Sequence, residues 1–194
     1  MAKSRPVCLA ALMLVVSVSS PVAAQERTDA WQVGTAVLPL PDSLRAGATV
    51  LGYRTGGLER LRAGTNGMVC LADDPAEEGF HVACYHDGLE PFMARGRALR
   101  TQGLGRAGVD SARLAEIEGG TLAGPKPGLV LYSVSLKDAV ADPAAGLPEG
   151  TKGLAVIYLP YATEATSGLS AQPSREHPWL MFAGKPWAHA MITR

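Results

Sequence analysis

The stretch Met68–His86, MVCLADDPAEEGFHVACYH, decides the fold of this chain. It holds two short apolar runs on either side of a five-residue loop, Pro75–Gly79. If Cys70 opposes Cys84, this loop has a normal hairpin length. Directly opposed residues in antiparallel strands lie within reach of a disulfide. Loop length and cysteine spacing therefore predict one antiparallel pair with a Cys70–Cys84 disulfide, and the alternative is a free, reactive Cys84 thiol.

Two more strands are predicted before this pair. The runs Thr49–Arg54 and Leu58–Ala63 are separated by the turn Thr55–Gly57. They are followed by Asn66-Gly67, a dipeptide typical of type I′ hairpin turns. Together with the cysteine pair, these runs predict an N-terminal meander of about four antiparallel strands.

The segment after His86 changes to helical patterning. Asp87 and Glu90 have capping-box spacing, and Pro91 favours a helix start, so a helix is predicted over 90–102. A second helix is predicted from Asp110, as N-cap, to Glu118. Strands are predicted over 129–136 and 153–160, with a closing C-terminal hairpin over 179–193. The order of elements predicts an α+β fold: an antiparallel sheet with an N-terminal meander, two central helices and a C-terminal hairpin.

Residues 1–24 have the three-part pattern of a cleavable signal peptide. A short basic start is followed by the apolar run Val7–Val18 and by small residues before a cut at Gln25. The run is shorter than the roughly 20 apolar residues of a membrane span. We therefore expect a secreted or periplasmic protein with no membrane span after signal removal. We divide the rest into an N-terminal segment, 25–47, partly helical with Asp29 as N-cap, and a single α+β domain, 48–194.

The charges of the chain are balanced. It has 18 basic and 18 acidic residues, and loss of Lys3 and Arg5 with the signal leaves 16 basic residues. A nearly neutral domain does not favour nucleic acid as a partner. Signatures of serine hydrolases, zinc proteases, dithiol redox proteins and c-type haem sites are missing from the sequence. No cofactor and no metal site are predicted.

The glycine pattern Gly103-Leu-Gly105-Arg-Ala-Gly108 matches the G-x-G-x-x-G of dinucleotide-binding folds. In those folds the glycines follow a strand and open a helix that receives the pyrophosphate. Here a helix is predicted before them, and no strand–helix–strand unit surrounds them. We interpret the pattern as a glycine-rich loop between two helices.

His86 and Glu90 are the candidate catalytic residues. His86 lies where a predicted strand passes into a helix, and such a junction can hold a general acid or base. Catalysis at His86 and Glu90 would also require Asp73 or His189 to be brought close by the fold. The competing interpretation is a polar residue that satisfies local backbone groups. His81 lies on the opposite strand face, where we expect a cross-strand charge pair with Asp73.

Two pairs of residues are candidate ligand-binding groups. Arg97 and Arg100 lie side by side on the predicted helix and are suited to a phosphate or carboxylate. Trp187 and His189 share one face of the last predicted strand. A solvated helix face and ordinary core packing are the competing interpretations of the two pairs.

Three segments resemble those of an uncharacterised family of exported bacterial proteins with no assigned activity: Thr65–Pro75 (TNGMVCLADDP), Ala83–Arg97 (ACYHDGLEPFMARGR) and Pro178–Ile192 (PWLMFAGKPWAHAMI). The resemblance implies no cofactor and no catalytic residue.

The leading hypothesis is a non-catalytic exported module that binds a small molecule, an envelope component or a protein partner. The alternative is a small exported hydrolase-like enzyme centred on His86 and Glu90. A third, a structural or inhibitor module, predicts an exposed apolar patch near Trp179 and Trp187.

Overall fold

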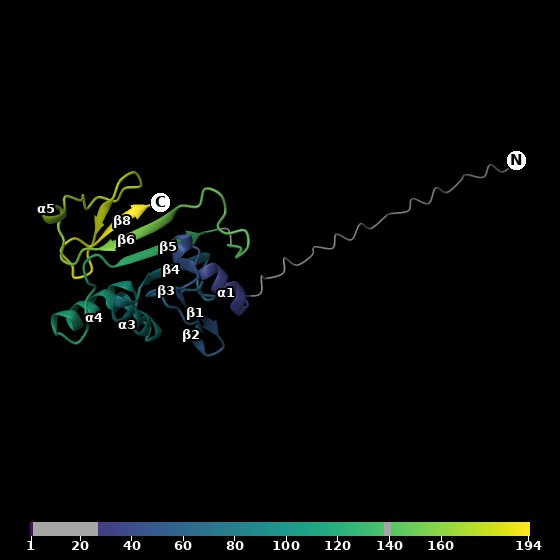
Figure 1. Cartoon of the computed structure of the whole chain (residues 1–194), viewed down its shortest axis with the longest axis horizontal. Coiled ribbons are helices and arrows are strands. Elements are labelled where there is room, and N and C mark those ends of the chain that lie inside the picture. The colour runs from purple at the N-terminus through teal and green to yellow at the C-terminus, as the bar shows by residue number, and fades with distance from the viewer. Residues whose placement is uncertain (2–26, 138–140) are drawn as a thin grey trace.

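The computed structural model describes Met1 and residues 27–137 and 141–194 (Figure 1). Apart from Met1, the predicted signal peptide lies outside these residues. The described chain forms a mixed, mostly antiparallel sheet with helices on it, which confirms the predicted α+β class. In the described ranges no helix combines the length and the apolarity needed to cross a bilayer.

The strands of the sheet are β1 (Thr49–Arg54), β2 (Gly57–Arg62), β3 (Met68–Leu71), β4 (Phe80–His86), β5 (Val130–Leu136), β6 (Gly153–Tyr158), β7 (Trp179–Met181) and β8 (His189–Thr193). Their order across the sheet is β2-β1-β3-β4-β5-β6-β8-β7. The helices are α1 (Asp29–Ala36), α2 (Asp42–Arg45), the 3₁₀ turn η1 (Asp87–Leu89), α3 (Glu90–Thr101), α4 (Arg106–Glu118) and α5 (Glu164–Ser167). The predicted C-terminal hairpin is the antiparallel pair β7–β8.

The β3–β4 pair has the predicted register. Cys70 is the partner of Cys84, and the two form a disulfide. Beyond the end of β3, the Asp73 carboxylate accepts a hydrogen bond from the backbone N–H of His81 (2.8 Å). Its other oxygen lies 2.9 Å from the guanidinium of Arg27. Asp73 and His81 therefore face each other as predicted, but Asp73 is bonded to the His81 main chain, and its ionic partner is Arg27.

The N-terminal meander is a wrong prediction. β2 pairs with β1, but β3 lies on the other side of β1 and runs parallel to it, so β2 and β3 are not neighbours. Asn66 makes no hairpin turn between them; its side-chain amide donates to the Leu44 carbonyl (2.7 Å). The physical reason is composition. β2 (GLERLR) carries three charged residues in six and suits a sheet edge, whereas β3 (MVCL) is apolar throughout and needs neighbours on both sides.

The two faces of the sheet carry separate apolar clusters, one with residues of α1 and α2 and the other with residues of α3. On one face, Ala36 and Leu40 pack against Cys70 and Cys84 in one apolar cluster. Because side chains alternate along a strand, Tyr85 points to the other face. There a second cluster joins Tyr85 to Phe92 of α3, to Tyr158 of β6 and to Trp187, which precedes β8. The sheet thus separates a disulfide layer from a layer built by α3 and α4.

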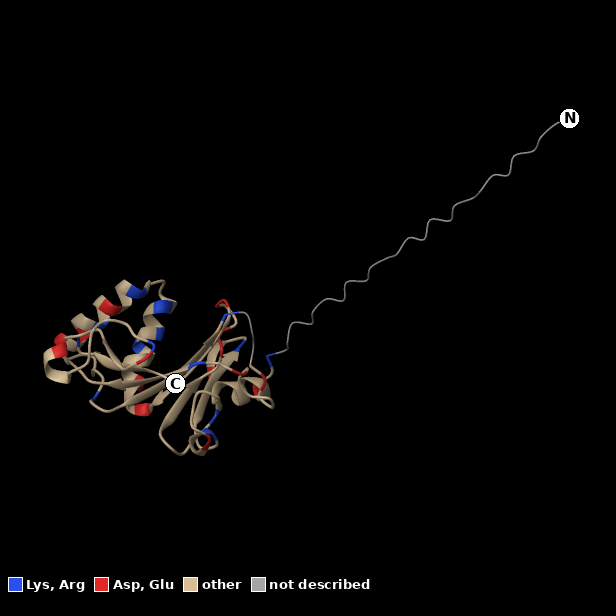
Figure 2. Ribbon diagram, turned by 90° about the horizontal axis from the view of Figure 1, so that it is seen from above, with Lys and Arg blue, Asp and Glu red and all other residues tan. Residues whose placement is uncertain are grey.

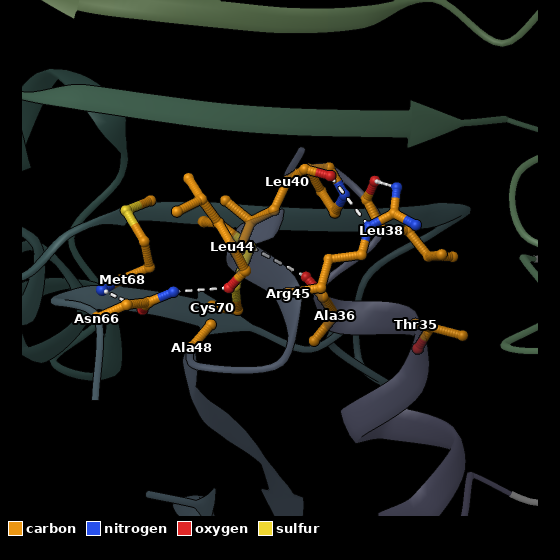
Figure 3. The surroundings of a disulfide bond; sticks show 12 residues. Thr35, Ala36, Leu38, Leu40, Leu44, Arg45, Ala48, Asn66, Met68 and Cys70 are labelled. Carbon is orange, nitrogen blue, oxygen red and sulfur yellow. Dashed lines mark hydrogen bonds between the residues drawn. A yellow bond between two sulfur atoms is a disulfide. The ribbon is translucent and has the colours of Figure 1, made fainter. Parts of the chain in front are cut away.

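The disulfide is sealed beneath the link between α1 and α2 (Figure 3). Both cysteines are fully buried. The Arg45 side chain closes the link by donating to the carbonyls of Leu38 (3.1 Å) and Leu40 (3.0 Å). The disulfide prediction is confirmed. Cys84 is bonded to Cys70, so the alternative of a reactive Cys84 thiol is wrong.

The two central helices form close to their predicted ranges. α3 begins at Glu90 with Pro91 in its first turn, as predicted, but the capping box from Asp87 to Glu90 does not form, because Asp87 lies in η1 and the N-cap of α3 is Leu89, with no side-chain bond. α4 ends at Glu118 as predicted, but it begins at Arg106, so Asp110 lies inside the helix and does not cap it. In the N-terminal segment the cap of α1 is Thr28 and not Asp29. Gly103–Gly105 links α3 to α4, which agrees with the inter-helix interpretation of the glycine pattern.

Candidate functional site

The helices α3 and α4 and the C-terminal strands border a cavity of about 410 Å³. We call it the Arg113 cavity. Four aromatic side chains line it, from α3, β6 and the segment around β7 and β8: Phe92, Tyr158, Phe182 and Trp187. Five charged or polar side chains also line the cavity: Arg100, Arg106, Asp110, Arg113 and His189.

The aromatic side chains form a continuous wall. The Trp187 ring lies 5.9 Å from the Phe92 ring and 6.2 Å from the Phe182 ring, measured between centroids. Tilted and edge-on contacts at these distances are favourable for aromatic pairs. Trp187 and Tyr158 are buried, and the apolar patch predicted near Trp187 is not exposed. A concave aromatic lining of this kind is typical of small-molecule sites.

Arg113 is the buried cation of the cavity, with only 8% of its surface exposed. Its guanidinium lies over the Phe92 ring at 3.9 Å, and Gly96 gives it room because a methyl group there would overlap it. Among the described residues no carboxylate pairs with it, and its buried Nε–H has no acceptor. Burial lowers the pKa of Arg113, and the positive charge of Arg100 adds to this.

The N-terminal end of α4 also borders the cavity, through Leu104 and the N-cap Gly105 before the helix and Arg106 in its first turn. Gly105 is the N-cap and offers no side chain to the first backbone N–H groups. Such groups are unsatisfied and carry partial positive charge. The Arg106 guanidinium lies over the Phe182 ring at 5.6 Å. Asp110 is the one acid of the lining, so the cavity is positive, although charges of both signs are mixed over the molecule as a whole (Figure 2).

His189 supplies a neutral hydrogen-bonding group. Its Nδ1 lies 2.8 Å from the backbone carbonyl of Trp187, so this nitrogen carries the proton and Nε2 is left as an acceptor. Burial lowers the pKa of His189, which keeps the imidazole neutral at pH 7. The buried indole N–H of Trp187 has no acceptor among the described residues.

Three of the four predicted ligand-binding residues meet in this cavity: Arg100, Trp187 and His189. Arg97 does not. It donates to the Tyr85 hydroxyl (2.8 Å) and to the Glu90 carboxylate (2.5 Å) on the neighbouring side of α3. The predicted pair Arg97 and Arg100 is therefore divided between a structural network and the cavity wall.

His86 and Glu90 are held by different partners. The His86 side chain is 44% exposed, and its Nδ1 accepts from the Gly88 backbone N–H (3.0 Å) at the start of η1. Glu90 accepts from the Tyr85 hydroxyl (2.5 Å) and pairs with Arg97, and burial raises the pKa of Tyr85. Neither His86 nor Glu90 lines the Arg113 cavity. Their arrangement is the one expected of a backbone cap and a structural ion pair.

A larger, open groove of about 960 Å³ lies between α3 and the β1 end of the sheet. Arg97 and Arg100 line the groove from α3, and Asp74 and Glu77 line it from the loop after β3. Burial and the neighbouring Asp74 raise the pKa of Tyr53, another lining residue, to about 12. Acids outnumber arginines in the lining of this groove, so it lacks the net positive charge of the Arg113 cavity.

Several residues of the cavity were not among the predicted site residues, and Arg113 and Phe182 are the most informative of them. For Arg113 a signal existed. It lies four residues after Val109, on the buried stripe of α4, where a charged residue is unusual. Phe182 lies beyond β7 in a left-handed backbone conformation (φ 56°), and no local pattern indicates its orientation.

In the part of the chain that the structure describes, no group of three or more His, Cys, Asp or Glu side chains is placed to hold a metal ion. Comparison of this chain with protein-family models, with curated proteins and with solved structures finds no match. The site must therefore be interpreted from its own geometry.

Proposed function

We propose that this protein is an exported, non-catalytic binding module that holds a small organic molecule with an apolar body in the Arg113 cavity. The observation that carries the proposal is the aromatic wall around a cavity of about 410 Å³. This volume falls within the roughly 300–1,000 Å³ of small-molecule sites. Buried Trp187 and Tyr158 supply the apolar surface, and the polar lining groups Arg113 and His189 supply orientation.

Two independent features support export. Residues 1–24 have the pattern of a signal peptide. The Cys70–Cys84 disulfide is typical of proteins in oxidising compartments such as the periplasm or the extracellular space. These features favour a protein that meets its ligand outside the cytoplasm.

The lining of the cavity favours binding over catalysis. Among the described residues, the lining contains no Ser, Thr, Cys or Lys that would serve as a nucleophile. The His189 Nδ1 is bonded to a backbone carbonyl and not to a carboxylate, so the imidazole lacks the orienting acid of a catalytic triad. The alternative, a hydrolase centred on His86 and Glu90, is less well supported because each residue is held in a separate local network.

The proposal is tested by following tryptophan fluorescence of the oxidised mature chain during titration with naphthalene-based probes. Binding is expected to change the emission of the wild type, and Trp187→Phe is expected to remove most of that change. Trp31 and Trp179, which do not line the cavity, remain in both proteins.

A matched pair at Val109 locates the probe. Val109 is buried and lines the cavity. Val109→Phe fills the space and is expected to abolish binding, whereas Val109→Ala enlarges it and is expected to preserve binding. Equal affinity of the two variants, or no binding of any probe up to about 1 mM, would contradict the proposal.

A further inference from the structure

The charge distribution of the Arg113 cavity indicates what kind of ligand it accepts. A buried guanidinium without a partner is costly, because burial removes water that solvated the charge. Arginine does not escape this cost by losing its proton, since the guanidinium stays protonated in proteins. Arg113 is 8% exposed, its buried Nε–H has no acceptor, and no carboxylate of the described chain lies within ion-pair distance of it. A ligand anion would supply the missing partner.

The side chain is positioned for this task and not loosely placed. Phe92 supports one face of the guanidinium at 3.9 Å, and the bare backbone of Gly96 accommodates its Nη2 edge. A guanidinium held in this way can donate charge-assisted N–H bonds to the oxygens of a carboxylate or a phosphate.

The surroundings add positive charge. Arg100 and Arg106 line the same cavity, and Asp110 is the single acid against them. Asp110 lies three residues before Arg113 on α4 but is not within ion-pair distance of it. Three arginines against one acid leave the cavity with a net positive charge, and a cleft of this kind attracts anions.

The backbone of α4 points to the same chemistry. This helix has 13 residues, and its N-terminal turn, capped by no side chain, borders the cavity. Unsatisfied N–H groups at a helix N-terminus form a ready anion site. Buried Arg113 is an independent observation in the same cavity, from a side chain and not from the backbone.

From these features, and resting on the proposed function, we propose that the ligand of the Arg113 cavity is an organic oxyanion, a carboxylate or a phosphate, attached to an aromatic or apolar body. Arg113 binds the oxyanion, and Arg100 and Arg106 supply the positive field. The wall of Phe92, Phe182 and Trp187 holds the apolar body.

The test compares three probes with the same ring system: 2-naphthoate, 2-naphthyl phosphate and neutral 2-naphthamide, measured by isothermal titration calorimetry. At least one anion is expected to bind the wild type about ten- to a hundredfold more tightly than the amide, the range of a charged hydrogen bond. The anion preferred identifies the oxyanion class. Raising the salt concentration is expected to weaken the binding of the anion and to leave the binding of the amide unchanged.

Arg113→Met is expected to bring the affinities of anion and amide together while the amide still binds. Arg95→Met is the control, because Arg95 pairs with Glu116 outside the cavity and its loss should preserve the preference for the anion. Equal affinity of the wild type for anions and amide would overturn this inference and leave the proposed function standing. No binding of any of the three probes would count against both.

Discussion

Gly96 determines where the buried cation of the cavity lies. A methyl group at this position would overlap the Arg113 guanidinium, which already lies on Phe92. Gly96→Ala therefore forces Arg113 to move, and overpacking of this kind costs about 1–3 kcal/mol. The gain in helix propensity, about 1 kcal/mol, offsets only part of that cost. We expect a lower free energy of unfolding in urea.

Gly108→Ala is the matched control within α4. The nearest atoms to a methyl group there belong to Leu104 at 3.5 Å, an ordinary contact. The substitution is expected to stabilise the protein by up to about 1 kcal/mol through helix propensity alone. If both alanine variants were equally stabilised, the tight placement of Arg113 against Gly96 would be wrong.

His189 gives the stability a pH dependence with a defined sign. Burial lowers its pKa in the folded protein below the ordinary value of 6.5. As the pH falls below 6.5, the unfolded chain therefore binds a proton that the folded chain resists, and stability decreases until the pH reaches the folded-state pKa. Above 6.5 this contribution is fully present.

The effect is measured as the melting temperature between pH 8 and pH 4, compared with His189→Gln, which does not titrate. The difference between the two proteins is expected to change across the acidic part of this range and to be constant above about pH 7. His177→Gln, in an exposed loop, is the control and should follow the wild type. Parallel curves for His189→Gln and the wild type would contradict the burial of a neutral imidazole.

At the scale of single elements, the disulfide stabilises the β3–β4 pair. It joins residues 14 apart in sequence and is buried on the α1 side of the sheet. In the chain-entropy model a loop of this size contributes about 3 kcal/mol. We expect Cys70→Ala/Cys84→Ala to lower the free energy of unfolding by roughly that amount. Titration of the unfolded, unreduced mature chain with a thiol reagent should find no free thiol, and two reactive thiols would disprove the bridge.

Local elements were predictable where their signals are local. The spacing of Cys70 and Cys84 determines the β3–β4 register, and Glu90 and Pro91 determine where α3 begins. The start of α4 was missed because Gly105 caps the helix with no side-chain signal, while Asp110, which resembles a cap, is part of the cavity lining.

Strand order is a different problem because it depends on distant contacts. Asn66-Gly67 is a strong hairpin signal, yet Asn66 bonds to the Leu44 carbonyl and the chain passes to the far side of β1. β3 takes this position because its apolar side chains are buried between two strands, and no local sequence pattern reveals which strands these are. For the same reason the sequence predicted Trp187 and His189 as a pair but did not show that Arg113 joins them from α4.

At the scale of the whole molecule, the sheet divides two tasks. The disulfide layer, with α1 and α2, lies on the face to which Cys70 and Cys84 point. The Arg113 cavity lies with α3 and α4 on the face to which Tyr85 points. Side chains of the two layers are separated by the thickness of the sheet and belong to different apolar clusters. Stability and ligand binding are therefore expected to be energetically separable.

This separation predicts additivity between the disulfide and Arg113. Cys70→Ala/Cys84→Ala should bind 2-naphthoate with nearly the affinity of the wild type, provided that the variant is measured well below its melting temperature. Arg113→Met should weaken binding equally with and without the disulfide, and the unfolding free energies of the combined variant should add within about 0.5 kcal/mol, as for distant sites. A double-mutant cycle measures the coupling between the two sites in the binding free energy and in the unfolding free energy. A coupling above about 1 kcal/mol would mean that β4, which carries Cys84 on one face and Tyr85 on the other, transmits strain between the two layers.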